Sequence, residues 1–136
     1  MNMREYEFRG KEKTIGWVYG SLLYFGANEY AIHLRNAEGS LIVDPETVGR
    51  LIGKKDIKNT PIYEGDICKF KFMEEPNKPI ELIGSFAWND EDLRYEIDIY
   101  SNEYPEYICL YYIGNGQIYD FEIIGNIFDN AELLNN

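Results

Sequence analysis

Short runs of alternating apolar and polar residues dominate the sequence, and turn-forming residues separate them. In residues 66–72, for example, Lys69 and Lys71 are predicted to share a strand face with Ile67. A period of two places successive side chains on opposite faces of an extended strand. No long segment carries apolar residues at the i, i+3, i+4, i+7 spacing of an amphipathic helix. The pattern predicts a mainly β protein with little helix.

The first part of the chain is predicted to form an antiparallel β meander. Its candidate strands are the short apolar runs at residues 15–19, 22–25, 30–34 and 41–43. Pro45 is expected to end this series, because proline has no N–H to donate to a sheet ladder. An extended run resumes at residues 47–52. We therefore predict a meander over residues 1–53.

The second part begins with a polar segment, residues 54–61, which we interpret as a hinge. Further strands are predicted at residues 66–72, 80–88, 93–100, 106–113 and 117–124. Residues 89–92 and 114–116 are predicted to form hairpin turns, since Asn and Gly tolerate the positive φ of tight turns. Residues 129–134 are expected to form one helical turn, with Asp129 or Asn130 accepting hydrogen bonds from its first amides.

The net charge of −11 is unevenly distributed along the chain. Residues 1–80 hold 12 basic and 12 acidic side chains, whereas residues 81–136 hold 12 acidic side chains and one basic residue, Arg94. Contacts to nucleic-acid phosphates need Lys and Arg. Direct binding of nucleic acid by the acidic part is therefore not expected.

Several classes of protein are disfavoured by the sequence. Residues 1–7 carry charges where a secretory signal would be apolar, and no apolar run approaches the roughly 20 residues of a membrane helix. Cys68 and Cys109 have no His or Cys nearby at metal-ligand spacing, so we expect free thiols in a reducing cytoplasm. The sequence predicts a cytoplasmic protein without a membrane span, a metal site or a cofactor.

Candidate catalytic groups have simpler structural interpretations. The acids in Glu64-Gly65-Asp66 suggest a carboxylate pair, but this sequence before a strand is typical of a tight turn. His33 is the only histidine, so no second one can complete a zinc site or a catalytic triad with it. Glycines at 10, 16, 20 and 26 suggest bends and bulges in the first sheet. We expect no enzyme; a carboxylate-pair hydrolase is the alternative, with no residues nominated.

Residues 91–112 are acidic and rich in tyrosine, which is enriched in protein interfaces because its large ring carries a polar end. A strand at residues 95–99 would place Glu96 and Asp98 on its solvated face. The candidate partner-contact residues are Tyr100, Tyr104, Tyr107, Tyr112, Glu96 and Asp98. The alternative is that the tyrosines line the core and the charges keep the protein soluble.

Lys54, Lys55 and Lys58 form the only basic cluster. They are candidates for contact with nucleic acid or with an acidic neighbour. The alternative is a solvated hinge, because nucleic-acid footprints usually lie on an overall basic domain.

Several ordered motifs resemble a known family. They are Phe8-Arg9-Gly10-Lys11, Gly16-Trp17-Val18-Tyr19-Gly20-Ser21-Leu22, Pro45-Glu46-Thr47-Val48-Gly49, Gly53-Lys54-Lys55-Asp56, Tyr63-Glu64-Gly65-Asp66-Ile67, and the closing Ile124-Gly125-Asn126-Ile127-Phe128-Asp129-Asn130-Ala131-Glu132-Leu133. Together they resemble the YopX family of bacteriophage and prophage proteins, nearly end to end. Thr60-Pro61 departs from the Gly-Lys-like turn that members usually carry.

The resemblance implies a β-rich fold in which residues 54–136 form an SH3-like small β-barrel, joined with the meander into one compact unit. It also implies a homo-oligomer encoded by a phage or prophage, without known enzymatic activity. We therefore expect an accessory protein that acts by self-assembly and protein–protein contact.

Charge-paired assembly is one predicted mechanism: the part that carries the Lys cluster lies against the acidic part of a neighbouring subunit. Two alternatives use the charges differently. An acidic mimic of DNA would occupy a basic host protein. A nucleic-acid-binding SH3-like module would gather Lys69 and Lys71 with the cluster on one side.

Overall fold

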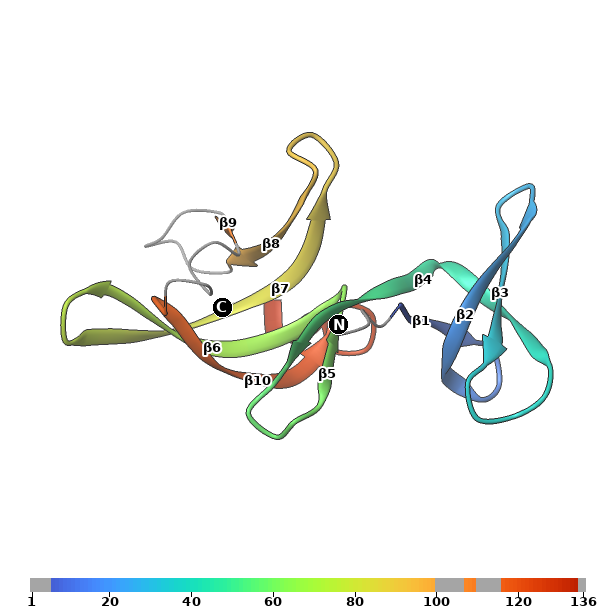
Figure 1. Cartoon of the computed structure of the whole chain (residues 1–136), viewed down its shortest axis with the longest axis horizontal. Coiled ribbons are helices and arrows are strands. Elements are labelled where there is room, and N and C mark those ends of the chain that lie inside the picture. Colours follow the sequence, from blue (N-terminus) through green and yellow to red (C-terminus); the bar gives the residue numbers. More distant parts are fainter. Residues whose placement is uncertain (1–5, 100–106, 110–115, 135–136) are drawn as a thin grey trace, which may run out of the picture. The chain divides into compact units, whose positions relative to one another are not determined.

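The computed structural model describes residues 6–99, 107–109 and 116–134. The chain divides into two compact units, residues 1–53 and 54–136 (Figure 1). The described elements are strands except for one short 3-10 helix, and none of these residues form a helix long and apolar enough to cross a membrane. The predicted mainly β class is confirmed.

The first unit is an antiparallel meander that closes on itself. Its strands are β1 (Phe8–Glu12), β2 (Gly16–Gly26), β3 (Glu29–Leu34) and β4 (Ser40–Lys55). They pair in sequence order, and β1 pairs with β4 as well. Val18, Ile32 and Val43 form the buried core, because their strands turn the same face inward.

Two details of the predicted meander were wrong. β1 was not predicted, and the separate strands at 15–19 and 22–25 are one continuous strand, β2. β2 passes close to β3 at Gly20, where an added Cβ would collide with the carbonyl oxygen of His33. Glycine therefore lets the strand continue where a larger residue would force it apart.

Pro45 does not end a strand, contrary to the prediction, because it lies in a bulge of β4. Arg9 faces Gly49 and Lys11 faces Asp44, so β4 carries extra residues between these two pairs. Within the bulge, the Thr47 hydroxyl accepts a hydrogen bond from the Lys11 N–H (2.8 Å) and donates one to the Asp44 carbonyl (2.7 Å). A bulge tolerates proline because the local ladder is already interrupted.

The second unit holds a five-stranded antiparallel sheet in the order β10-β6-β7-β8-β9. Its elements are β5 (Pro61–Tyr63), β6 (Asp66–Glu75), β7 (Lys78–Asn89), β8 (Arg94–Ile99), β9 (Tyr107–Cys109), β10 (Ile118–Asn126) and the 3-10 helix η1 (Ala131–Leu134). Phe70 and Phe86 pack against Phe121 in the core, with ring centroids 5.3 and 5.5 Å apart.

The turn at residues 89–92 joins β7 to β8 as predicted. The hairpin predicted around residues 114–116 is wrong, because β9 and β10 lie at opposite edges of the sheet; residues 110–115 themselves are outside the described part. No pairing among the described residues closes this sheet, so the SH3-like barrel stays a prediction.

The predicted C-terminal helical turn forms as η1, and a second, side-chain-bonded turn precedes it. The Asn126 side-chain oxygen accepts hydrogen bonds from the N–H groups of Phe128 and Asp129 (3.0 and 2.9 Å). Asn130 instead reaches back to accept a hydrogen bond from the Asn126 N–H (3.1 Å). The side chains thus organise the turn before η1, and the predicted cap by Asp129 or Asn130 stays a prediction.

Candidate protein-contact site

The turn between β7 and β8 is organised by Asn89. Its side-chain oxygen accepts hydrogen bonds from the N–H groups of Glu91 (2.9 Å) and Asp92 (3.1 Å). Its side-chain nitrogen donates to carboxylate oxygens of Asp92 (3.3 Å) and Glu96 (3.0 Å). These local hydrogen bonds hold the turn in one conformation. Figure 1 shows the hairpin extending beyond the other strands of its unit.

The end of this hairpin exposes large apolar side chains. Trp88 is 44% exposed and packs edge-on against its cross-strand partner Tyr95, with ring centroids 5.0 Å apart. The Trp88 indole N–H donates a 2.7 Å hydrogen bond to Asp90. Leu93 is 73% exposed and has φ of +52°, which is rare and unfavourable for a leucine. An exposed, strained leucine adds little to folding and points to a contact role.

Three carboxylates surround these apolar groups. Asp90, Glu91 and Asp92 are all exposed. Arg94, the nearest cation along the chain, lies 3.5 Å from Asp92 and 2.9 Å from Glu96. We call Trp88 together with residues 90–93 the acidic tip. It combines negative charge with exposed apolar area.

The predicted solvated acidic face is wrong at Glu96. This side chain is only 5% exposed, and its carboxylate accepts hydrogen bonds from Arg94 (2.9 Å) and Asn89 (3.0 Å). Asp98 is half-buried, and both burial and the neighbouring Glu96 carboxylate raise its pKa. Glu96 therefore supports the hairpin from inside, and the contact role of Asp98 stays a prediction.

The predicted tyrosine contacts fall mainly outside the described part. Tyr107 lies in β9, where its backbone is opposite Asp98. Tyr100, Tyr104 and Tyr112 lie outside the described residues. Their role as contacts stays a prediction.

The lysines of the basic cluster are exposed, and two of them line a pocket of about 300 Å³. Its lining residues are Lys54, Lys55, Asp56, Ile57, Gly116, Ile118, Tyr119, Asp120 and Phe121. The Ile57 N–H donates a 2.8 Å hydrogen bond to the Phe121 carbonyl, which fixes one wall of the pocket to β10. We call this the lysine pocket. The sequence had grouped the lysines but could not show the apolar wall that β10 contributes.

The segment predicted as a hinge contains a hydrogen-bonded turn centred on Asp56. Its buried carboxylate accepts hydrogen bonds from the N–H groups of Lys58 and Thr60 (both 2.9 Å) and, across to β10, of Ile123 (3.1 Å). Burial opposes ionisation, but these three amides and the Lys58 charge lower the Asp56 pKa. The Asp56 carboxylate therefore holds the turn that lines the pocket and is not a reactive acid.

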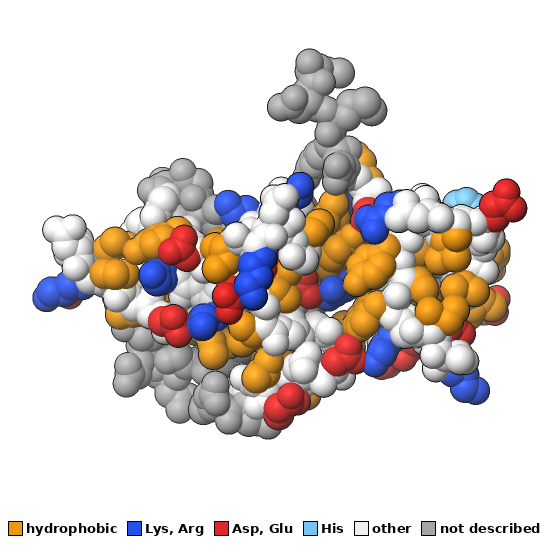
Figure 2. Space-filling view, turned by 90° about the horizontal axis from the view of Figure 1, so that it is seen from below, with side chains coloured by type: hydrophobic (Ala, Val, Ile, Leu, Met, Phe, Trp, Pro, Cys, Tyr) orange, Lys and Arg blue, Asp and Glu red, His pale blue; other side chains and the backbone are white. Residues whose placement is uncertain are grey.

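Lys69 and Lys71 do not join the basic cluster as independent charges. Lys69 lies 3.8 Å from Glu122 and Lys71 lies 3.7 Å from Asp120, both carboxylates being on the neighbouring strand β10. Basic and acidic side chains thus alternate across this face. Figure 2 likewise shows Lys and Arg side chains interspersed with Asp, Glu and exposed hydrophobic side chains.

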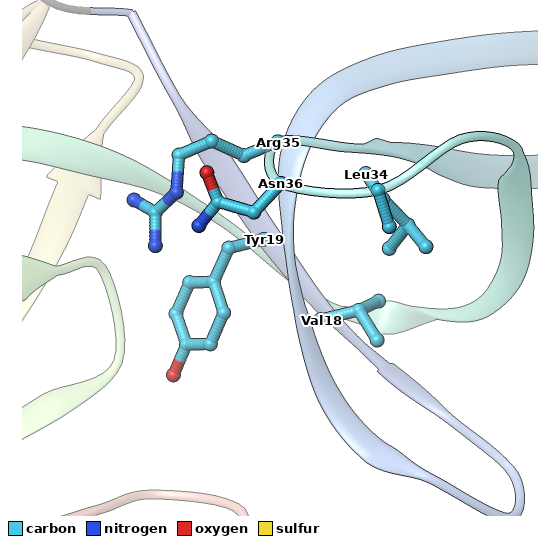
Figure 3. Close-up of a pocket in the computed structure, with 6 residues that line it drawn as sticks. Val18, Tyr19, Leu34, Arg35 and Asn36 are labelled. Carbon is cyan, nitrogen blue, oxygen red and sulfur yellow. The ribbon is translucent and has the colours of Figure 1, made fainter.

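The first unit carries a smaller pocket of about 200 Å³. Figure 3 shows Tyr19, Arg35 and Asn36 on one side of it and Val18 and Leu34 on the other. The Arg35 guanidinium lies 2.8 Å from Glu7 and stacks 5.8 Å from the Tyr19 ring centroid. A protein carboxylate already occupies this guanidinium, so the pocket has no vacant anion site at Arg35.

Three exposed apolar side chains on the same unit were not predicted as surface residues. Tyr24, Phe25 and Ile42 are each 60% exposed or more. Tyr24 is opposite Tyr30, which is opposite the buried Val43, so Tyr24 shares the core face and packs against Tyr30 with ring centroids 5.0 Å apart. Ile42 precedes Val43 in β4 and lies on the other face of the sheet. Only the observed register separates these residues from one another.

The other residues considered as catalytic or metal-binding candidates occupy positions that structural roles explain. Gly65 has φ of +88°, and Asp66 accepts a 2.8 Å hydrogen bond from the Tyr63 N–H, so residues 64–66 form the predicted turn. His33 is exposed and lies 3.2 Å from the Ser40 hydroxyl. Cys68 is buried without a disulfide. Within the described ranges, no group of three His, Cys, Asp or Glu residues could hold a metal ion.

Comparison with known proteins identifies the family. No curated protein matches the chain. The family model described as YopX protein matches residues 5–135, which is nearly all of the 136-residue sequence. The match covers both compact units, including the acidic tip and the lysine pocket. The chain therefore belongs to the YopX family.

Proposed function

We propose that this protein is a phage- or prophage-encoded accessory protein without enzymatic activity, which acts by self-assembly and protein–protein contact. One observation carries the proposal: Trp88 and Leu93 are exposed together in one hairpin, at the acidic tip. The first unit exposes Tyr24, Phe25 and Ile42 as well, on more than one face of its sheet. Clustered exposed apolar side chains are typical of surfaces that contact other proteins.

The distribution of charge supports contacts between protein surfaces. The first unit has six Lys and Arg against seven Asp and Glu, whereas the second has seven against seventeen. Like charges on the second unit repel those of another copy unless basic side chains meet acidic ones. The exposed lysines of the basic cluster provide such side chains.

The titrating groups with shifted pKa values support a non-enzymatic role. Glu12 has a lowered pKa because it accepts hydrogen bonds from the N–H groups of Ile15 and Thr14 in the β1–β2 turn. Asp56 organises its own turn, and burial raises the pKa of the Cys68 thiol, which disfavours the reactive thiolate. These three shifts follow from structural roles rather than from a converging catalytic set. The fourth, at Asp98, follows from burial and from the neighbouring Glu96 carboxylate, which raise its pKa.

A measurement of solution mass tests the proposal. Light scattering on the full chain, at 50 mM and 1 M NaCl, should give a discrete multiple of 15.9 kDa that decreases as salt screens charged contacts. A protein that remains a monomer at each salt concentration, even at the highest attainable protein concentration, would contradict self-assembly.

A further inference from the structure

We infer that copies of this chain join head to tail, with the acidic tip of one copy docked into the lysine pocket of the next. This inference rests on the proposed function and specifies which surfaces perform the self-assembly. Both surfaces belong to the second unit, so one folded unit carries both halves of the contact.

Charge complementarity is the first argument. The tip presents the exposed carboxylates Asp90 and Glu91 together with Asp92. The pocket presents the exposed ammonium groups of Lys54 and Lys55, and Lys58 follows in the adjoining turn. Opposite charges at the two surfaces favour association between copies despite the overall negative charge.

The two carboxylates of the pocket have partners other than Lys54 and Lys55. Asp56 is buried and accepts hydrogen bonds from three backbone amides. Asp120 is exposed, but its carboxylate lies 3.7 Å from the Lys71 ammonium. Lys54 and Lys55 therefore remain available to the carboxylates of an incoming tip.

Apolar complementarity is the second argument. The tip carries Leu93 and Trp88, and the pocket offers the apolar side chain of Ile57, which is 56% exposed. Ile118 and Phe121 also line the pocket, but each is only 2% exposed. The volume of about 300 Å³ has room for a leucine side chain. Docking would remove the Leu93 side chain from water. The unfavourable backbone conformation of Leu93 would then serve to present that side chain to the neighbouring copy.

The tip is not docked into the pocket of its own chain. Leu93 is 73% exposed, whereas a docked side chain would be buried. Figure 1 shows the end of the β7–β8 hairpin and β10 in different regions of the unit. The contact that we infer therefore joins different copies.

When two copies join through this contact, one of them keeps an unoccupied tip and the other keeps an unoccupied pocket. Further copies can add in the same way until the assembly closes or grows as a chain. A closed assembly would satisfy each tip and pocket, which explains how a discrete mass can arise from this contact.

Paired charge reversals test the inference. Asp90→Lys with Glu91→Lys reverses the tip, and Lys54→Glu with Lys55→Glu reverses the pocket. Each pair should raise the dissociation constant of assembly about tenfold or more, measured by sedimentation over a dilution series. The four substitutions in one chain should restore assembly to within about threefold of the native value, because the charges are again opposite.

The design separates a specific contact from net repulsion. The tip reversal changes the net charge from −11 to −7, whereas the pocket reversal changes it from −11 to −15. Repulsion alone would strengthen assembly in the first variant and weaken it in the second. Lys13→Glu with Lys78→Glu also gives −15 at exposed positions outside both surfaces, and this matched control should leave assembly unchanged.

Leu93→Asn provides a test without a charge change. Asparagine accepts positive φ better than leucine, so the variant should be at least as resistant to urea as the native protein. Its assembly should nevertheless weaken about tenfold, because the docked apolar side chain is lost. Lower assembly at unchanged fold stability would support a contact role for Leu93.

The outcomes distinguish this inference from the proposed function. Native assembly with both charge reversals behaving like the control would overturn the tip-to-pocket contact and leave self-assembly in place. A native monomer would overturn both. If the pocket reversal leaves the mass unchanged but abolishes salt-sensitive binding of a fluorescent DNA oligonucleotide, the lysines bind nucleic acid and the inference is wrong.

Discussion

The Thr47 hydroxyl lies 2.8 Å from the backbone nitrogen of Lys11, which is 36 residues earlier in the chain. This hydrogen bond replaces a ladder interaction where the β4 bulge separates the two backbones. A single buried hydroxyl thus closes the first unit at its most irregular point. β1 and β4 can pair on both sides of the bulge because the Thr47 hydroxyl accepts the hydrogen bond of the Lys11 N–H.

Replacing this hydroxyl should weaken the first unit. Thr47→Val keeps the side-chain shape but leaves the Lys11 N–H without its acceptor, so the free energy of unfolding should fall by about 1–3 kcal/mol. Urea unfolding followed by tryptophan fluorescence measures the change. Thr14→Val, at an exposed turn position, should change the value by less than about 0.5 kcal/mol. Equal effects at the two sites would contradict the role of the Thr47 hydroxyl.

Asp56 should make the stability of the second unit depend on pH. Hydrogen bonds lower its folded-state pKa below the usual 3.8, so its stabilisation is complete above that value and is lost as pH falls through the folded pKa. Asp56→Asn should cost about 1.5–3 kcal/mol at pH 7, because an amide nitrogen would face backbone donors. The difference between variant and native protein should shrink below pH 3.8.

Urea titrations at pH 7 and at pH 3 check this expectation. Asp44→Asn is a suitable comparison, because Asp44 is exposed and accepts one hydrogen bond in a local turn. A deficit in Asp56→Asn that stays constant between the two pH values would show that the charge of Asp56 is not what stabilises the turn.

Gly84 should not tolerate a larger residue. An added Cβ would lie 2.5 Å from the Ile97 side chain and 2.6 Å from the Asp98 carbonyl oxygen on β8. Gly84→Ala should therefore lower the free energy of unfolding by about 1–3 kcal/mol through overpacking. Thermal and urea unfolding measure the loss. Ser21→Ala, at an exposed strand position, should be nearly neutral; a neutral Gly84→Ala would refute the close approach of β7 and β8.

The Cys68 thiol should be unreactive while the protein is folded. Burial raises its pKa, and the carboxylates of Asp66 and Asp56 add to that effect. In a Cys109→Ser variant, a thiol-specific chromogenic reagent at pH 8 should label no cysteine before urea is added. One thiol per chain should react after unfolding. Rapid labelling of the native variant would show that solvent reaches Cys68.

Local pattern was enough to predict most of the strands, though not β1, because side-chain alternation is a property of neighbouring residues. It identified the β7–β8 turn from Asn89 and the three acids that follow, and it grouped Lys54, Lys55 and Lys58. It failed for residues 114–116, where turn-forming residues connect strands that end at opposite sheet edges. Turn chemistry marks a reversal of the chain but does not select the strand that becomes the neighbour.

The sequence by itself determined the mainly β class, the family and the charge asymmetry. Only the tertiary structure decided that Pro45 lies in a bulge, that Glu96 is buried, and that Leu93 is exposed at a hairpin end. The physical reason is the range of the interactions. Alternation acts between adjacent residues, whereas the Asp56 carboxylate is fixed by the Ile123 amide 67 residues away, so pairing and burial follow from contacts that no local pattern contains.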